Sequence, residues 1–412
     1  MRTPTPHPLA DLWGVLVTPF GAVGATTATT VLAYLALATV AYLVYRLGAQ
    51  WFDRAIGILA ALLVLTRVPF LSNGLRAFVD LPYLALVLGA LLVESRRPRA
   101  GWPVLALLAA AGLLRPEAWL FSFAYLAYLL LGPGPDRRRL VLWTALALAG
   151  PLLWAIFDLG TTGEPLYSFT ATRDTVEILG RHTGLVELFT YSPHQLVQTM
   201  GEAGLLAAAA GICLAVAFLW RRSLVALAAL AAAAVAFAVL ASAGLAIISR
   251  YMMLGGAILC VFCAVALLGW RLLGPEQRVW RRRWQAVAVL LLLVFLVSVP
   301  RQKNDLAQVV DVLREEQEIE SDLHDLADEG RFDISCQPIS VPGVQAVPRL
   351  GRWLGLGPEE FVLVDEADPT PRGYFFAPAS AGAEVHYGAA QRPPPGFERV
   401  AQNPSWRLYR RC

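Results

Sequence analysis

The stretch LVALAALAAAAVAFAVLASAGLA, residues 224–246, decides the class of fold. It carries no charge, and it is longer than the roughly 20 apolar residues that cross a bilayer as a helix. Similar apolar segments recur along the chain, at 27–45, 55–71, 77–94, 102–114, 118–131, 140–158, 203–220, 252–270 and 285–300. The sequence therefore predicts an all-α polytopic membrane protein with about ten transmembrane helices.

Composition agrees with this class. Of the 412 residues, 57% are hydrophobic and only 16% are charged, whereas soluble domains carry about a quarter charged residues. The net charge is +3 and no basic stretch is interleaved with aromatic residues, so nucleic acid is not an expected partner. The sequence has no phosphate-binding loop, dinucleotide-binding glycine motif or zinc-protease motif, and the short loops leave no room for a nucleotide-binding domain. An ATP-driven pump is therefore disfavoured.

The distribution of Arg predicts the topology. Fifteen Arg lie in one set of alternating loops, at 46–54, 95–101, 132–139, 221–223 and 271–283. The other set carries only five Arg over a greater length, at 72–80, 115–117, 159–200 and 247–251. The positive-inside rule places the first set in the cytoplasm. We therefore expect a multi-pass protein of the plasma (inner) membrane with both termini extracytoplasmic.

Three regions follow from these patterns. Residues 1–25 are expected to be extracytoplasmic, as the remnant of a first outer loop, and residues 26–300 to form the multi-helix transmembrane domain with an outer loop at 159–200. Residues 301–412 are expected to form a small extracytoplasmic α/β domain, because charged residues become frequent there. The predicted elements of that domain are an amphipathic helix at 304–329 capped by Asn304 or Asp305 and ended by Gly330, then strands at Phe332–Ser335, Phe361–Val364, Gly373–Phe376 and Trp406–Arg410.

Charges inside or beside apolar spans are the candidate functional residues, because burying a charge is costly without a partner or water. Asp80, Arg115, Glu117 and Arg250 all fall at the predicted outer ends of different spans. Arg67 is expected to hold helices together instead. Pro116 cannot continue a straight helix, so Arg115-Pro116-Glu117 predicts a turn between two short apolar segments. Ordinary boundary residues that reach the lipid headgroups are the alternative interpretation of this set.

The cysteines divide by position. Cys213, Cys260 and Cys263 lie in apolar runs, where they are expected to be small packing residues. Cys336 and Cys412 are the only cysteines of the tail, and a tail outside the cytoplasm would keep them oxidised. We therefore predict a disulfide between Cys336 and Cys412.

Four short motifs resemble the GT-C superfamily of integral-membrane glycosyltransferases. They are Pro6-His7-Pro8-Leu9, Asp80-Leu81-Pro82, Gly112-Leu113-Leu114-Arg115-Pro116-Glu117 and Arg250-Tyr251. Each motif is weak alone, but together they run over most of the chain and resemble the protein-mannosyltransferase and aminoarabinose-transferase branches. Family members begin with a cytoplasmic N-terminus, a first helix and an outer loop with the catalytic Asp. The resemblance implies that this chain lacks that helix and loop.

The resemblance implies a function. The expected activity is transfer of a sugar from a polyprenyl-phosphate donor to an extracytoplasmic acceptor, with Asp80 as the catalytic carboxylate. His7, Arg115, Glu117, Arg250 and Tyr251 would bind substrate and phosphate, and membrane lipid would be the other partner. No cofactor is certain, although a divalent metal would be compatible with the chemistry.

Two alternatives remain open at the sequence level. A transporter or flippase for a lipid or amphiphile would explain the spans and the buried charges, and it would be favoured by discontinuous helices. A non-catalytic membrane subunit of an assembly complex would also fit the spans.

Overall fold

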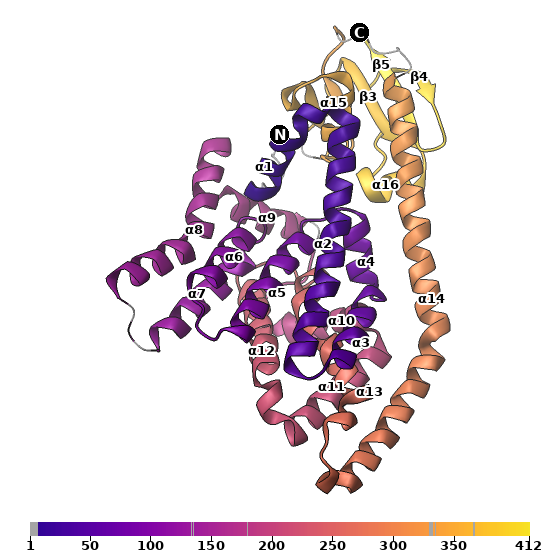
Figure 1. Ribbon diagram of the computed structural model, residues 1–412. Helices are drawn as coiled ribbons and strands as arrows, with labels where there is room; N and C mark the ends of the chain where they lie inside the picture. Colours follow the sequence, from indigo (N-terminus) through magenta and orange to yellow (C-terminus); the bar gives the residue numbers. More distant parts are fainter. Residues whose placement is uncertain are drawn as a thin grey trace. The chain divides into compact units, whose positions relative to one another are not determined.

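The computed structural model describes residues 7–132, 134, 136–178, 180–328, 333, 335–365 and 367–412. Two compact units divide this chain (Figure 1): a helical unit that ends at Lys303, and a smaller unit that comprises Asn304–Cys412. The helical unit contains α1 Pro8–Val17, η1 Thr18–Phe20, α2 Gly21–Trp51, α3 Arg54–Leu65, α4 Val68–Leu75, α5 Asp80–Arg96, α6 Trp102–Gly112, α7 Glu117–Leu130, α8 Arg137–Thr162, α9 Tyr167–Ile178, α10 Leu185–Met200, α11 Glu202–Phe218, α12 Trp220–Ser242, η2 Ser249–Met252, α13 Met253–Leu268, η3 Gly269–Leu272, η4 Pro275–Gln277 and the first part of α14 Arg278–Asp328.

The chain is a helical membrane protein. Among the described residues, five helices are long and apolar enough to cross a bilayer, in the segments Val23–Trp51, Arg137–Thr162, Trp220–Ser242, Ser249–Leu272 and Pro275–Asp328. Two further pairs pass only as bent spans: α3 with α4 at 63°, and α10 with α11 at 100°. Nine of the ten predicted apolar segments fall mainly on one helix each, whereas 55–71 is divided between α3 and α4. Among these helices, α5, α6 and α7 have only 17, 11 and 14 residues.

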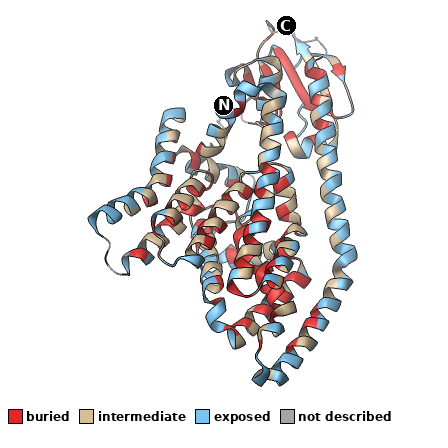
Figure 2. Cartoon of the chain, viewed as in Figure 1, coloured by how far each residue is buried: buried red, intermediate tan, exposed pale blue. Residues whose placement is uncertain are grey.

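Small residues let α13 pack at the centre of the helical unit. Nearly all of its residues are buried (Figure 2), and its sequence MLGGAILCVFCAVALL supplies the Gly, Ala and Cys that close helix crossings need. At the crossing with α11, a Cβ atom on Gly211 would lie 1.9 Å from the carbonyl oxygen of Phe262. A Cβ on Gly48 of α2 would lie 2.8 Å from the Cα atom of Gly57 in α3. Cys260 and Cys263 are buried packing residues, as expected, whereas Cys213 is exposed.

Two regions that were predicted as loops are largely helical. The predicted outer loop 159–200 contains the end of α8 together with α9 and α10. The predicted remnant at 1–25 contains α1, η1 and the start of α2; residues 1–6 of that segment lie outside the described residues. Apolar residues occur at helical spacing in both regions, although each is too short or too polar to resemble a span. Leu185, Leu188 and Phe189 of α10 show that spacing.

The smaller unit is an α/β domain built on a five-stranded sheet of order β2-β1-β3-β5-β4. The parallel strands β1, β2 and β3 adjoin the antiparallel strands β5 and β4. The end of α14 packs on the sheet through Ile319, Leu323 and Leu326, and Trp406 is fully buried among them. The elements after α14 are β1 Ile339–Val341, α15 Val347–Leu354, η5 Pro358–Glu360, β2 Phe361–Leu363, β3 Gly373–Pro378, α16 Ala381–Tyr387, β4 Glu398–Gln402 and β5 Trp406–Arg411.

The predicted start of the tail helix needs correction. The predicted helix 304–329 is not capped at Asn304 or Asp305, because the preceding apolar segment is already helical and α14 continues from Arg278 to Asp328. Its predicted end at Gly330 lies outside the described residues, as do residues 332 and 334 of the predicted strand Phe332–Ser335. The last strand, β5, pairs with β3 and β4.

The expected disulfide joins Cys336 and Cys412, whose Cα atoms are 5.5 Å apart. It ties the last residue of the chain to the segment before β1. The strands predicted at Phe361–Val364, Gly373–Phe376 and Trp406–Arg410 correspond to β2, β3 and β5.

Candidate functional site

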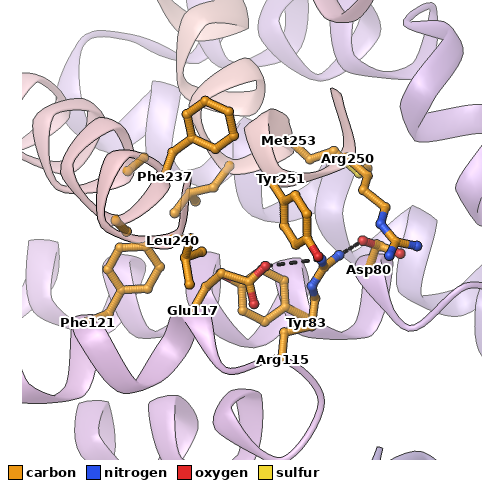
Figure 3. A pocket seen from close by; sticks show the side chains of 13 residues that line it. Asp80, Tyr83, Arg115, Glu117, Phe121, Phe237, Leu240, Arg250, Tyr251 and Met253 are labelled. Atoms are coloured by element: carbon orange, nitrogen blue, oxygen red, sulfur yellow. Dashed lines mark ion pairs between the residues drawn. The ribbon is translucent and has the colours of Figure 1, made fainter. Parts of the chain in front are cut away.

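A pocket in the helical unit gathers five of the residues predicted from sequence. Asp80, Arg115, Glu117, Arg250 and Tyr251 line one pocket (Figure 3). They come from the start of α5, the turn between α6 and α7, the start of α7, and η2. Residues up to 171 positions apart in the chain are thus brought to one place.

Local sequence signals place these side chains at helix ends. Asp80 is the first residue of α5, and it follows a turn in which Ala77 has a left-handed φ of 57°. Pro116 precedes α7, as the predicted turn requires, and Arg115 lies in the gap between α6 and α7. Glu117 is the first residue of α7, where a carboxylate is favoured by the helix dipole.

Arg115 is the centre of a buried ion cluster. One guanidinium nitrogen pairs with Asp80, and the other lies 3.0 Å from Oε1 of Glu117. These three residues are only 5%, 3% and 5% exposed. The guanidinium carbon also lies 4.4 Å from the ring centroid of Tyr251 and 5.8 Å from that of Tyr83. Because charges at this depth are tolerated only when paired, the cluster holds three helices in one arrangement.

Two charged groups of the pocket remain available to a ligand. Oε2 of Glu117 is buried and accepts no hydrogen bond from any described residue. Arg250 is exposed, and its guanidinium carbon lies 5.5 Å from the ring centroid of Tyr251. It forms no ion pair with a carboxylate in the part of the chain that the structure describes. Oε2 of Glu117 and the guanidinium group of Arg250 are therefore groups of this pocket with which a ligand could pair.

The opposite wall of the pocket is apolar. Figure 3 shows Phe121, Phe237 and Leu240 on the far side of Glu117 from Arg250. Phe121 belongs to α7, and Phe237 and Leu240 belong to α12, with Ala233 and Ala236 beside them. Sequence reasoning missed these residues and Tyr83, because apolar and aromatic residues within a span carry no signal that separates a pocket wall from ordinary packing.

His7 lies near this cluster but does not line the pocket. It precedes α1, and α1 contacts the α6–α7 turn through the Leu9 amide, which donates to the carbonyl of Leu113 at 3.2 Å. The His7 ring packs edge-on against Trp154, with 5.8 Å between ring centroids, and its Nδ1 is buried without a hydrogen-bond partner among the described residues. Burial, and then the charge of Arg115, lower the pKa of His7 to about 4.

Two other buried charges are structural. Arg67 donates to the carbonyls of Met200 and Leu63, and so links the break between α3 and α4 to the end of α10. This is the helix-linking role expected for it. Asp158 of α8 is 1% exposed, and its carboxylate accepts from the amide and hydroxyl of Ser168 at 2.9 and 2.7 Å. Both groups are satisfied within the fold.

No group of three His, Cys, Asp or Glu side chains that could hold a metal ion occurs among the described residues. No protein-family model matches the sequence, and no curated protein matches it significantly.

Proposed function

We propose that the chain is a membrane glycosyltransferase that moves a sugar from a polyprenyl-phosphate donor to an extracytoplasmic acceptor. One observation carries the proposal: the pocket sets the free Glu117 oxygen and the free Arg250 guanidinium beside an apolar wall at the ends of membrane helices. A lipid-linked sugar combines the groups that such a pocket would hold, namely an apolar chain, a phosphate and a ring with hydroxyls. The four motifs that resemble the GT-C superfamily agree with this substrate.

The reaction breaks the bond between the anomeric carbon of the sugar and the phosphate oxygen. The acceptor hydroxyl forms the new bond and loses its proton, and the polyprenyl phosphate leaves with the electron pair. In this proposal Oε2 of Glu117 takes the proton, because this oxygen lines the pocket side of the ion cluster without a hydrogen-bond partner among the described residues. Arg250, with Arg115 behind it, stabilises the departing phosphate, since a guanidinium group binds phosphate through two parallel hydrogen bonds.

Asp80 has a different role in this proposal from the one expected at the sequence level. Its carboxylate is paired with Arg115, and in this proposal it positions the Arg115 guanidinium. Tyr251 supports both cations through its ring face. His7 steadies the α6–α7 turn from outside the pocket, and no divalent metal is assigned.

The proposed topology places the pocket on the extracytoplasmic side of the plasma (inner) membrane, with about ten crossings and both termini outside. Asp80 begins α5 and Glu117 begins α7, whereas the Arg-rich segments 95–101 and 132–139 follow the other ends of these helices. A disulfide in the smaller unit supports an oxidising compartment for the tail.

A lipid flippase is the second candidate, and a specific observation favours it. Two helix pairs are sharply broken, α3–α4 and α10–α11, and Arg67 joins the two breaks. Broken helices are typical of transporters. A flippase would move the lipid-linked sugar intact, whereas a transferase would release polyprenyl phosphate.

Binding of undecaprenyl phosphate to the purified protein tests the shared substrate. The proposal predicts that Arg250→Gln weakens this binding at least about tenfold, as expected when one charged phosphate contact is lost. Arg181→Gln, a change of another exposed Arg, is the matched control and should leave binding unchanged. Equal binding of undecaprenol, which has no phosphate, would contradict the proposal.

A further inference from the structure

A second charged surface of the helical unit lies far from the pocket along α12 and α13. It is formed by the turn between α11 and α12, by η3, and by the start of α14, which lie together at the lower end of the unit in Figure 1. Seven Arg residues are exposed there, and we call them the basic patch: Arg221, Arg222, Arg271, Arg278, Arg281, Arg282 and Arg283.

Aromatic contacts show that these three segments form one surface. Phe218, at the end of α11, packs against Trp280 and Trp284 of α14, with ring centroids 5.2 and 6.1 Å apart. The guanidinium carbon of Arg281 lies 5.4 Å from the ring centroid of Trp270, which belongs to η3. Trp284 is buried and donates to the carbonyl of Ala266 at 2.9 Å, which anchors α14 to α13.

The positive charge of the basic patch is not neutralised within the described chain. None of its seven Arg forms an ion pair with a described carboxylate. Glu276 is the acid within the same segments, and Asp53 follows Phe52, whose carbonyl accepts from Arg222 at 3.3 Å. Asp53 itself caps α3 by accepting from the amide of Ile56. Two acids therefore face seven cations.

The charges also stand at helix ends where the protein alone disfavours them. Arg221 and Arg222 lie in the first turn of α12, which has no acid there. Arg278 begins α14 directly after η4, where Glu276 is the acid. Cations at a helix N-terminus are repelled by the helix dipole. An external anion bound at this surface would reduce the repulsion between the Arg side chains. It would also offset the unfavourable interaction of these side chains with the helix dipole.

We propose that the basic patch binds the phosphate groups of anionic phospholipids. Its setting selects this partner: Trp220 and Trp280 are about half exposed beside the Arg residues, at the ends of apolar helices. Trp side chains concentrate at the headgroup level of a bilayer, and clusters of four to eight basic residues next to membrane helices attract anionic lipids. The patch thereby fixes the depth and tilt of α12 and α14 in the membrane.

Binding of a fluorescent short-chain phosphatidylglycerol to the full chain in neutral detergent tests this, with phosphatidylcholine as the comparison. Phosphatidylglycerol should bind more tightly, and the preference should shrink as salt rises. Replacing Arg281–Arg283 with Gln should weaken phosphatidylglycerol binding at least about tenfold, since each Arg near a lipid surface contributes about fivefold. Replacing the same residues with Lys should retain most of the binding, because the charge is kept.

The matched control replaces Arg137–Arg139, another exposed run of three Arg at a helix start, which includes the Arg139–Asp136 ion pair. This variant should bind phosphatidylglycerol like the unchanged protein. Equal affinity for the two lipids, an equal loss in the control variant, or full binding after the change of Arg281–Arg283 to Gln would each overturn the proposal. Displacement of the lipid by inorganic phosphate at constant ionic strength would also overturn it, by showing a site for the free ion.

Discussion

Removing the cation from the buried ion cluster should destabilise the helical unit more than any other single change in the pocket. Arg115→Met keeps the apolar length of the side chain but leaves the carboxylates of Asp80 and Glu117 buried without a partner. Both residues are about 95% buried or more, so bulk water compensates little for the lost ion pairs. Breaking a buried ion pair in this way costs about 3–5 kcal/mol.

A triple variant separates the loss of the pair from the loss of the charge. Asp80→Asn with Arg115→Met and Glu117→Gln removes all three charges, and such neutral replacements of a buried cluster are often close to neutral in stability. The triple variant should therefore recover most of the stability that Arg115→Met alone loses. If the two carboxylates were mobile and hydrated, Arg115→Met alone would cause only a small loss of stability.

Cys260 and Cys263 provide the assay. Both thiols are buried in α13 and react with a thiol-sensitive fluorophore only when the helical unit unfolds. Cys213 is exposed, so it is replaced by Ala in every variant to remove its background. If the Arg115→Met protein melts like the parent, the ion cluster does not stabilise the helical unit. If the triple variant is no more stable than Arg115→Met alone, unpaired buried carboxylates are not the cause of the loss.

Three other changes test separate parts of the fold. Cys412→Ser should destabilise the smaller unit by about 4 kcal/mol, because it opens the loop of 76 residues that the bond to Cys336 closes. The near-ultraviolet circular dichroism of the smaller unit should then be lost at a lower denaturant concentration. Gly211→Ala should cost about 1–3 kcal/mol of helical-unit stability, since the added Cβ meets the Phe262 carbonyl, and an unchanged melting temperature would show that the crossing is looser. For His7 the pKa is lowered to about 4, so the unfolded chain binds more protons between pH 4 and 6.5; stability should fall on acidification through this window, and His7→Gln should reduce that fall in a melting series.

The helical unit could be predicted in outline because apolar runs report membrane helices directly. Nine of the ten apolar segments lie mainly on one helix each. The turn around Pro116, which separates the short helices α6 and α7, was also predicted, whereas the break of segment 55–71 into α3 and α4 was not. The helical character of 159–200 was missed because α9 and α10 carry enough polar residues to resemble a loop.

The candidate site was predictable through its charges alone. A charge at the end of an apolar span is conspicuous, so Asp80, Arg115, Glu117 and Arg250 could be selected from the sequence. Which carboxylate is paired and which oxygen is free depends on the side-chain geometry around Arg115, which no spacing in the sequence encodes.

In the smaller unit, too, some elements could be predicted from the sequence and others could not. The strands β2, β3 and β5 contain aromatic residues and were predicted, whereas β1 (ISV) and β4 (ERVAQ) contain none and were missed. Strand order depends on long-range packing around Trp406 and could not be read from the sequence.

Release of labelled sugar from a synthetic undecaprenyl-phosphate hexose is the most direct test of the proposed function. The full chain is reconstituted in liposomes, water serves as the acceptor, and undecaprenyl phosphate is measured as the second product. The account predicts release by the unchanged protein and a loss of about a hundredfold or more in Glu117→Gln, the contribution of a general base. Release that is indifferent to Glu117→Gln, or passage of the intact lipid across the bilayer with no undecaprenyl phosphate formed, would contradict it.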